Sequence, residues 1–274
     1  MKKTIRFGMV QGRLTKSPPN CLQWFPQNSW EDEFKTAAEI GLDYIELIAE
    51  RQHNAINPIW SEDGLRKIHK LVTSNELTLH ALCNDFIIEN SLLDDAVIQQ
   101  NIELINQGQK LGIEKYIMPL FENSELNSKN MKDYIASIRL VANAANKNNM
   151  LTCLETILTG KELVKLLELI DLPYVKVVYD TGNRVAFGHN LSNDIRLLNG
   201  YIAHVHIKDK NINNENTLLG TGLVNFEQVF YALNDINYDG PFTFETVRGF
   251  NPVKTAIYNM QVVEFFKENS ELNV

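Results

Sequence analysis

The stretch LTCLETILTGKELVKLLELIDLPYVKVVYD (residues 151–180) decides how this chain folds. It contains two short apolar runs, Leu151–Glu155 and Val175–Asp180, on either side of a helical pattern at Glu162–Ile170 that stops before Pro173. Short apolar runs rich in β-branched residues are typical of buried parallel strands. The stretch therefore predicts one strand–helix–strand repeat, and each of its strands ends in a carboxylate.

The same alternation of strand and helix continues along the whole chain. Strands are expected at Ile5–Val10, Tyr44–Ile48, Thr78–Leu82, Lys115–Pro119, Leu151–Glu155, Val175–Asp180, Ile202–Ile207 and Phe242–Glu245. Helices are expected at Trp30–Ile40, Leu65–Ser74, Ala96–Leu111, Met131–Asn148, Glu162–Ile170, Leu191–Leu198, Phe226–Leu233 and Val253–Phe266. Eight strands that each precede a helix predict an α/β fold, a closed (β/α)8 TIM barrel formed by one domain of residues 1–274.

An open, doubly wound sheet is the alternative arrangement of alternating strands and helices. Such a sheet usually has a glycine-rich first turn of the form GxGxxG. At that place this chain has GMVQGR, residues 8–13, which does not fit the motif. The closed barrel is therefore the preferred prediction.

The composition limits the partners of the protein. The 274 residues are 44% hydrophobic and carry a formal net charge of −8. Because nucleic-acid binding needs clustered Lys and Arg, no nucleic-acid partner is expected. No run reaches the length of a membrane span, no signal peptide is visible, and the three cysteines form no CxxC, so we expect a soluble, cytoplasmic protein without a membrane partner. A homodimer is the default assembly.

Four side chains of metal-binding type stand at or just past the ends of four successive predicted strands: Glu155, Asp180, His206 and Glu245. Strand ends on one face of a closed parallel barrel are where (β/α)8 enzymes keep their chemistry. One such acid is an ordinary surface charge, but four such groups on consecutive strands predict a site for one divalent ion. The imidazole shifts the preference from Mg²⁺ or Ca²⁺ toward Mn²⁺, Co²⁺, Fe²⁺ or Zn²⁺.

Two glutamates that face each other across a metal suit proton transfer. A metal that binds a hydroxyketone through its carbonyl and hydroxyl oxygens stabilises an enediolate. Glu155 or Glu245 can then remove the proton beside the carbonyl, while the other glutamate returns a proton. Return from the opposite side gives epimerisation, and return to the neighbouring carbon gives isomerisation.

Other polar residues near the strand ends are candidates for substrate contact. Gln11 and Arg13 follow the first strand, and Glu46 ends the second, where it could bind a substrate hydroxyl or support a metal ligand. Lys208 and Arg248 follow the seventh and eighth strands, where such barrels often bind phosphate. A solvated loop or a strand-end salt bridge is the alternative for these positions.

Two histidines lie inside predicted strands. His80 is expected to be a hydrogen-bonded core residue, and His204 shares the face of His206 one layer deeper. Three long irregular segments, residues 12–28, 83–95 and 208–225, all follow strands. We expect them to overhang the active face and to carry substrate contacts or a lid.

Several segments of the second half carry a family resemblance. They are CLET around Glu155, VVYDTGN at Val177–Asn183, HVHIKD at His204–Asp209, GTGLVNF at Gly220–Phe226 and YDGPFTFET at Tyr238–Thr246. They resemble the xylose isomerase-like (β/α)8 superfamily, in its branch of sugar and sugar-phosphate isomerases and 3-epimerases. The resemblance implies a small sugar or sugar-phosphate substrate and one metal, most often Mn²⁺, on Glu155, Asp180, His206 and Glu245. It also implies that Glu155 and Glu245 form the acid–base pair.

The resemblance leaves the substrate open. Asn183, a further candidate for substrate binding, matches the phosphate-substrate epimerases, where the tagatose-type enzymes carry a histidine. The basic cluster that those phosphate enzymes have after strand three is replaced here by CNDF, Cys83–Phe86. A metal-dependent dehydratase on the same scaffold, of the inosose or dehydroshikimate type, and a non-catalytic sugar-binding barrel are the competing hypotheses.

Overall fold

Eight parallel strands close into a ring in the order β1-β10-β7-β6-β5-β4-β3-β2. The computed structural model describes residues 5–19 and 21–272, so residues 1–4, 20 and 273–274 of the predicted domain lie outside the described chain. The strands of the ring are β1 (Phe7–Val10), β2 (Tyr44–Ala49), β3 (Thr78–Asn84), β4 (Lys115–Pro119), β5 (Leu151–Glu155), β6 (Val175–Asp180), β7 (Ile202–Ile207) and β10 (Phe242–Phe244).

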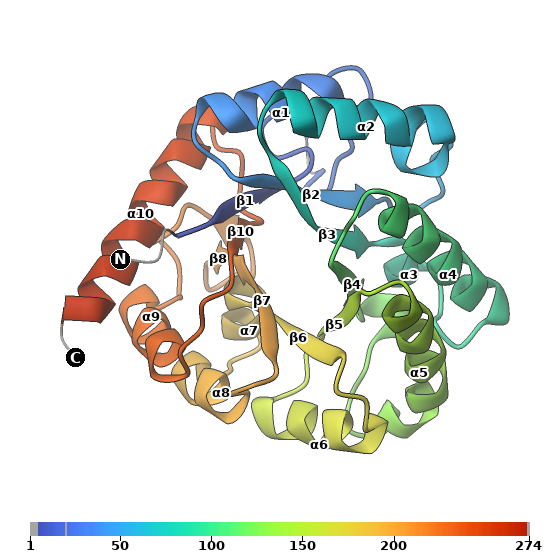
Figure 1. Ribbon diagram of the computed structural model, residues 1–274. Coiled ribbons are helices and arrows are strands. Elements are labelled where there is room, and N and C mark those ends of the chain that lie inside the picture. Colours follow the sequence, from blue (N-terminus) through green and yellow to red (C-terminus); the bar gives the residue numbers. More distant parts are fainter. Residues whose placement is uncertain (1–4, 20, 273–274) are drawn as a thin grey trace.

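Helices form the outer layer around this ring, as Figure 1 shows. They are α1 (Trp30–Glu39), α2 (Glu62–Ser74), α4 (Asp95–Lys110), α5 (Met131–Lys147), α6 (Gly160–Ile170), α8 (Leu191–Leu197), α9 (Phe226–Asp235) and α10 (Pro252–Leu272). Each lies between two strands of the ring or after the last one, which is the arrangement expected of right-handed crossovers. The predicted (β/α)8 TIM barrel is thereby confirmed.

The predicted strands all form, with limits that shift by a few residues. β1 begins at Phe7, β3 extends to Asn84, and β10 ends at Phe244, so Glu245 lies just beyond its strand. The short elements above the barrel were not predicted. They are α3 (Phe86–Glu89), α7 (Thr181–Ala186), the hairpin β8 (Asp209–Lys210) with β9 (Asn216–Thr217), and the 3-10 turns η1 (Pro58–Trp60) and η2 (Glu122–Ser124).

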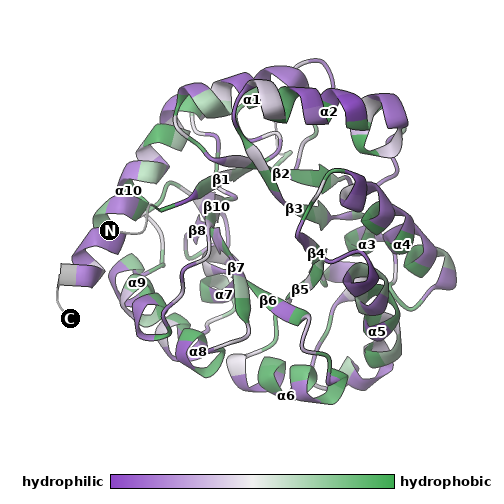
Figure 2. Ribbon diagram, viewed as in Figure 1, coloured by the Kyte–Doolittle hydropathy of each residue, from purple (hydrophilic) through white to green (hydrophobic). Residues whose placement is uncertain are grey.

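Helix α6 illustrates why these segments become helices. The Thr159 hydroxyl accepts a hydrogen bond from the backbone of Glu162, whose carboxylate in turn binds the Thr159 backbone N–H, which forms a capping box. Its apolar face is buried by Leu163, Leu166, Leu167 and Ile170. In Figure 2 the strands are mostly hydrophobic, whereas the outer helices alternate between the two colours, as amphipathic helices should. Among the described residues, no helix combines the length and apolarity needed to cross a bilayer.

The strand register sets which polar side chains meet at the mouth of the barrel. Asp180 on β6 lies opposite His206 on β7, and His206 lies opposite Thr243 on β10. Glu245 follows Thr243 by two residues, and alternate residues of a strand point to the same side. The register therefore directs these polar side chains toward the carboxyl ends of the strands, around the barrel axis.

The seam of the ring, where β1 meets β10, is stabilised by hydrogen bonds between the segment that follows β1 and the side chains of Glu33 and Arg248. The Glu33 carboxylate accepts hydrogen bonds from the backbone N–H groups of Gly12 (2.7 Å) and Leu14 (3.0 Å). The Arg248 guanidinium donates to the carbonyls of Gly12, Cys21 and Leu22 at 2.8–3.2 Å. Gly12 has a φ of 86°, and a Cβ there would collide with the Trp24 carbonyl. These hydrogen bonds fix the segment that follows β1 at the carboxyl ends of the strands.

Candidate metal centre

Four side chains converge at the carboxyl ends of the strands, and they are those that the sequence singled out. Glu155, Asp180, His206 and Glu245 are all buried, and one ligand atom from each lies within 4.8 Å of the others. They come from β5, β6, β7 and the residue after β10. Neighbouring positions in the ring thus supply three carboxylates and one imidazole to a common centre.

The separations within this cluster suit a bound cation. The Nδ1 atom of His206 lies 3.4 Å from Glu245 Oε2, 3.8 Å from Glu155 Oε2 and 4.0 Å from Asp180 Oδ2. Donors that are each about 2.0–2.2 Å from one ion stand about 3–4 Å apart. Nδ1 of His206 is buried without a hydrogen-bond partner, whereas Oδ2 of Asp180 is paired with the Lys208 ammonium group. An unsatisfied buried imidazole nitrogen that faces three carboxylates fits a divalent ion between them.

The other side of the His206 ring is fixed by Glu46. Oε1 of Glu46 lies 3.0 Å from Nε2 of His206, and its Oε2 lies 2.7 Å from Nε2 of His204. All three side chains are buried. A carboxylate that accepts the Nε2 proton leaves the Nδ1 lone pair directed at the cluster. Glu46 therefore contacts the candidate metal ligand His206 directly, where it can orient the imidazole ring. The salt bridge expected at this strand end is also present, and its partners are His204 and His206.

Two cationic side chains offset the negative charge of the cluster. Lys208 Nζ lies 3.0 Å from Asp180 Oδ2 and 2.7 Å from Glu245 Oε2. Arg13 lies 3.2 Å from Glu245 Oε1 and also donates to the Thr246 carbonyl at 2.8 Å. Both cations are buried. Lys208 contacts the cluster carboxylates, and Arg248 contacts backbone carbonyls through Nε and Nη1 while its Nη2 has no partner. The anion-binding role expected of both stays a prediction.

Asn183 and Gln11 complete the polar surroundings. Asn183 donates from its side chain to Glu155 Oε1 at 2.7 Å and from its backbone to Asp180 Oδ1 at 2.6 Å. Gln11 is buried, and its Nε2 atom has no partner. Asn183 thus orients two of the cluster carboxylates.

The electrostatic environment shifts the two glutamates in opposite directions. Burial and the Asp180 carboxylate raise the pKa of Glu155 to about 8. Burial would also raise the pKa of Glu245, but Lys208 and His206 lower it well below its usual range. Burial disfavours a charge on His206, yet Glu46 and Glu245 raise its pKa well above the ordinary value. A proton on His206 and a metal ion therefore compete for the same nitrogen.

A cavity of about 320 Å³ opens above the cluster. Its lining includes Glu46, Glu122, Glu155, Asn183, His206 and Glu245 together with residues that sequence reasoning did not select: Gln23, Arg51, Asp85, Glu125, Ile157, Phe187 and Lys210. Gln11, Arg13, Lys208 and Arg248 do not line it. Most of the residues that the sequence analysis did not select follow strands two to seven. Their position just after a strand end is the sequence feature that could have identified them as cavity-lining residues.

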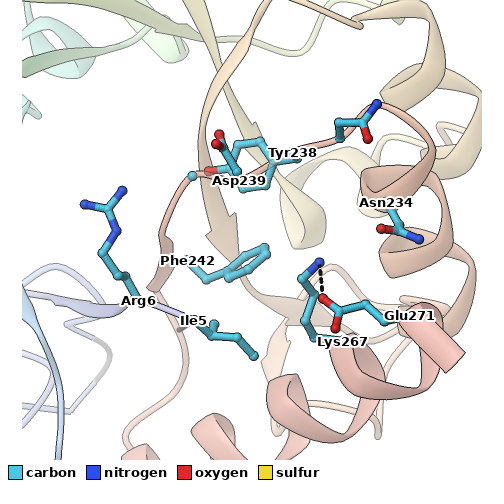
Figure 3. Close-up of a pocket in the computed structure, with 10 residues that line it drawn as sticks. Ile5, Arg6, Asn234, Tyr238, Asp239, Phe242, Lys267 and Glu271 are labelled. Carbon is cyan, nitrogen blue, oxygen red and sulfur yellow. Dashed lines mark ion pairs between the residues drawn. The ribbon is translucent and has the colours of Figure 1, made fainter. Parts of the chain in front are cut away.

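A second, larger hollow lies at the opposite end of the barrel. It has a volume of about 480 Å³ and lies between the starts of β1 and β10 and helix α10. Figure 3 shows Lys267 paired with Glu271 there, beside Phe242 and Tyr238. In the described part of the chain, the His, Cys, Asp and Glu groups that could hold a metal lie elsewhere, around Glu46 and His206. We therefore assign the functional site to the smaller cavity.

A closed parallel barrel with a carboxylate–imidazole centre at its strand ends defines the class of protein. Residues 34–264 match the family described as xylose isomerase-like TIM barrel, and the chain belongs to that family. L-ribulose-5-phosphate 3-epimerase of Escherichia coli is 20% identical over 233 residues, which cover 79% of this chain and 81% of that protein.

Solved structures of sugar epimerases share the fold. An L-ribulose 3-epimerase superimposes with a TM-score of 0.78 at 16% identity, with coverage of 98% of this chain and 97% of that one. D-psicose 3-epimerase from Clostridium cellulolyticum H10, solved with D-tagatose, gives a TM-score of 0.76 at 18% identity and covers 96% and 99% of the two chains. These relatives are enzymes that epimerise sugars.

Proposed function

We propose that this protein is a divalent-metal-dependent isomerase or epimerase of a sugar or sugar phosphate, acting on the carbon next to a ketose carbonyl. The observation that carries the proposal is the convergence of the buried side chains of Glu155, Asp180, His206 and Glu245, with Nδ1 of His206 free of any hydrogen bond. The epimerase activities named for its relatives support the reaction class.

The four cluster residues would hold the ion, for which we propose Mn²⁺, with Zn²⁺, Co²⁺ or Mg²⁺ as alternatives. When bound, such a cation polarises the carbonyl and the adjacent hydroxyl of a ketose and so makes the neighbouring C–H more acidic. Glu46 and Asn183 keep His206 and Glu155 in position for this task. Burial of the cluster limits access of bulk water to the substrate.

Glu155 and Glu245 would transfer the protons. One carboxylate removes the proton from the carbon beside the carbonyl, which gives an enediolate of the sugar, and the other delivers a proton to the opposite face. The two groups have pKa values shifted in opposite directions, and such a difference is what an acid–base pair requires. Lys208, His206 and Arg13 keep Glu245 ionised and lower its affinity for a proton, whereas burial raises that of Glu155, so either glutamate is proposed as the base.

The decisive experiment monitors ketoses and ketose phosphates by proton NMR in heavy water, with the protein loaded with Mn²⁺. We expect deuterium to enter the carbon beside the carbonyl, together with the epimer or the isomer. An unsaturated product that absorbs in the ultraviolet would show a dehydratase instead. Absence of exchange across a broad panel, despite tight metal binding, would favour a sugar-binding barrel and overturn the proposal.

We also propose a cytoplasmic location. It is supported by Cys21, Cys83 and Cys153, which are all free thiols, as is usual in a reducing compartment. A homodimer remains the assembly we expect. Size-exclusion chromatography with light scattering tests the assembly, and fractionation of cells tests the location.

A further inference from the structure

Two adjoining cavities lead outward from the metal centre. The first holds the centre itself, and the second, of about 540 Å³, shares Leu22, Gln23, Arg51 and Asp85 with it. The rest of the second cavity is mainly uncharged, with Trp24, Gln27, Gln52 and Asn54 among its lining. Aromatic and amide side chains are suited to the faces and the hydroxyl groups of a sugar.

The charges that line the first cavity do not suit a phosphate. Outside the four proposed metal ligands they comprise the carboxylates Glu46, Asp85, Glu122 and Glu125 and the cations Arg51 and Lys210. Arg51 is already paired with Glu122 at 2.6 Å and with Glu89 at 2.8 Å. A dianion placed here would meet an excess of carboxylates and a largely occupied guanidinium.

The other cations near the site also have most of their donors occupied. The buried Lys208 binds the cluster carboxylates, and the buried Arg13 binds Glu245. The half-buried Arg248 binds three backbone carbonyls, and its unpartnered Nη2 is outside the lining of both cavities. Lys210 lines the cavity as a single ammonium group and donates to Asn214 at 2.8 Å. Phosphate recognition generally uses several donors at once, such as a bidentate arginine or a row of backbone N–H groups.

Asp85 lines both cavities and has a carboxylate oxygen that is available to a ligand. It follows β3, is 2% exposed, and lies where the two cavities meet. Its Oδ1 accepts a hydrogen bond from the Cys83 thiol at 3.4 Å, while its Oδ2 has no partner. A buried carboxylate oxygen that faces a cavity requires a donor, and a sugar hydroxyl supplies one without adding negative charge.

We propose that the substrate is an uncharged sugar without a phosphate group, and that Asp85 binds one of its hydroxyl groups away from the reacting carbon. The proposal rests on the function proposed above and narrows its substrate class. It separates this protein from the L-ribulose-5-phosphate 3-epimerase to which its sequence is similar.

The experiment compares matched pairs, such as L-ribulose with L-ribulose 5-phosphate, as substrates of the Mn²⁺-loaded protein. We expect kcat/KM to be at least about tenfold higher for the free sugar, which corresponds to about 1.4 kcal/mol. A higher kcat/KM for the phosphorylated partner overturns this inference but leaves the proposed function intact. Failure of both members of every pair overturns the proposed function itself.

Variants of Asp85 test its contact directly. Asp85→Ala should lower kcat/KM for the free sugar by about 10- to 100-fold, the usual effect of losing a hydrogen bond to a charged group, with unchanged Mn²⁺ affinity in calorimetry. Asp85→Asn should reduce the preference for the free sugar over its phosphate, because the repulsion is gone. The exposed Asp94 on the same connection gives the control Asp94→Asn, which should leave both values unchanged. An Asp85→Ala protein that folds, binds Mn²⁺ and keeps full kcat/KM would contradict the assignment.

Discussion

The two ends of the barrel both bury ionisable side chains, but they treat them differently. At the amino-terminal end of the strands, Lys115 donates to the Ala203 carbonyl at 2.6 Å and lies 2.7 Å from His80, whose other nitrogen lies 3.3 Å from Glu114. At the mouth, His206 Nδ1 and Asp85 Oδ2 have no hydrogen-bond partner. A structural network satisfies its own members, whereas a binding site leaves atoms for its ligand.

Replacing Glu155 should produce the largest effect and sharpen this contrast. We expect Glu155→Gln to lower proton exchange by about 10²- to 10⁴-fold, since a general acid–base group is lost. The metal-free variant should unfold at the same temperature as the parent or higher, because burial and Asp180 disfavour the ionised carboxylate. NMR exchange and thermal denaturation measure the two quantities. Retention of most of the exchange rate would show that Glu155 is not in the acid–base pair.

The matched change at the other end is Lys115→Ala. It removes both contacts of the ammonium group and leaves the Ala203 carbonyl and His80 unsatisfied, so the free energy of unfolding should fall by about 2–4 kcal/mol. Activity per folded molecule should be unchanged. Urea denaturation and the exchange assay test both statements, and a loss of kcat comparable to that of Glu155→Gln would break the division between the two ends.

Glu46 lies between the two networks, and its replacement tests which one it serves. If it orients His206, Glu46→Gln should weaken Mn²⁺ binding by about 10- to 100-fold in isothermal titration calorimetry. His80→Gln is the matched control, because His80 lies deeper in the barrel and does not touch the cluster. Equal metal affinity in Glu46→Gln and the parent would assign Glu46 to the core instead.

Acid should act on the two ends over different pH ranges. Because the pKa of Glu155 is raised to about 8, its proton competes with the metal, and Mn²⁺ affinity should fall by up to about tenfold per unit as the pH drops below 8. Calorimetry at several pH values would reveal a proton released on binding. Affinity that is constant between pH 6 and 8 would contradict the raised pKa.

At the amino-terminal end of the barrel, the expected effect of acid is smaller and concerns the stability of the fold. Burial, then Lys115, lowers the pKa of His80 to about 3, so the unfolded chain takes up a proton first as the pH falls below about 6.5. Stability is therefore full above that pH and declines below it, with a slope of at most about 1.4 kcal/mol per unit from this residue. Chemical denaturation of the metal-free protein and of His80→Gln would isolate this contribution.

The sequence predicts local features better than the contacts between distant strands. Runs such as VKVVYD mark a buried strand and place Asp180 at its end, which is sufficient to identify the cluster once the barrel is assumed. The role of Glu46 depends on His204 and His206, which lie about 160 positions away in the chain and become neighbours only in the closed ring. Arg248 likewise has the charge of a phosphate ligand, and only the path of the segment after β1 shows that backbone carbonyls use it.

Short elements above the barrel are hard to predict for a related reason. Helix α7 begins where the Asp180 side chain accepts the Asn183 backbone N–H, so a cluster carboxylate starts the helix. Gly182 within it has no side chain, and a Cβ there would press on the Lys208 side chain. TGNRVA is too short, and its pattern too weak, to predict a helix from the sequence. The helix forms because tertiary contacts stabilise it.

The seam between β1 and β10 also has a consequence for the order of assembly. Phe7 pairs with Phe242, so this junction joins segments from opposite ends of the chain and carries a large loop-closure entropy. Glu245 follows the last strand, whereas its partner Arg13 follows the first. A nascent chain therefore completes the set of four metal-binding residues only after its final strand docks. A ribosome-bound intermediate that lacks this strand has three of the four.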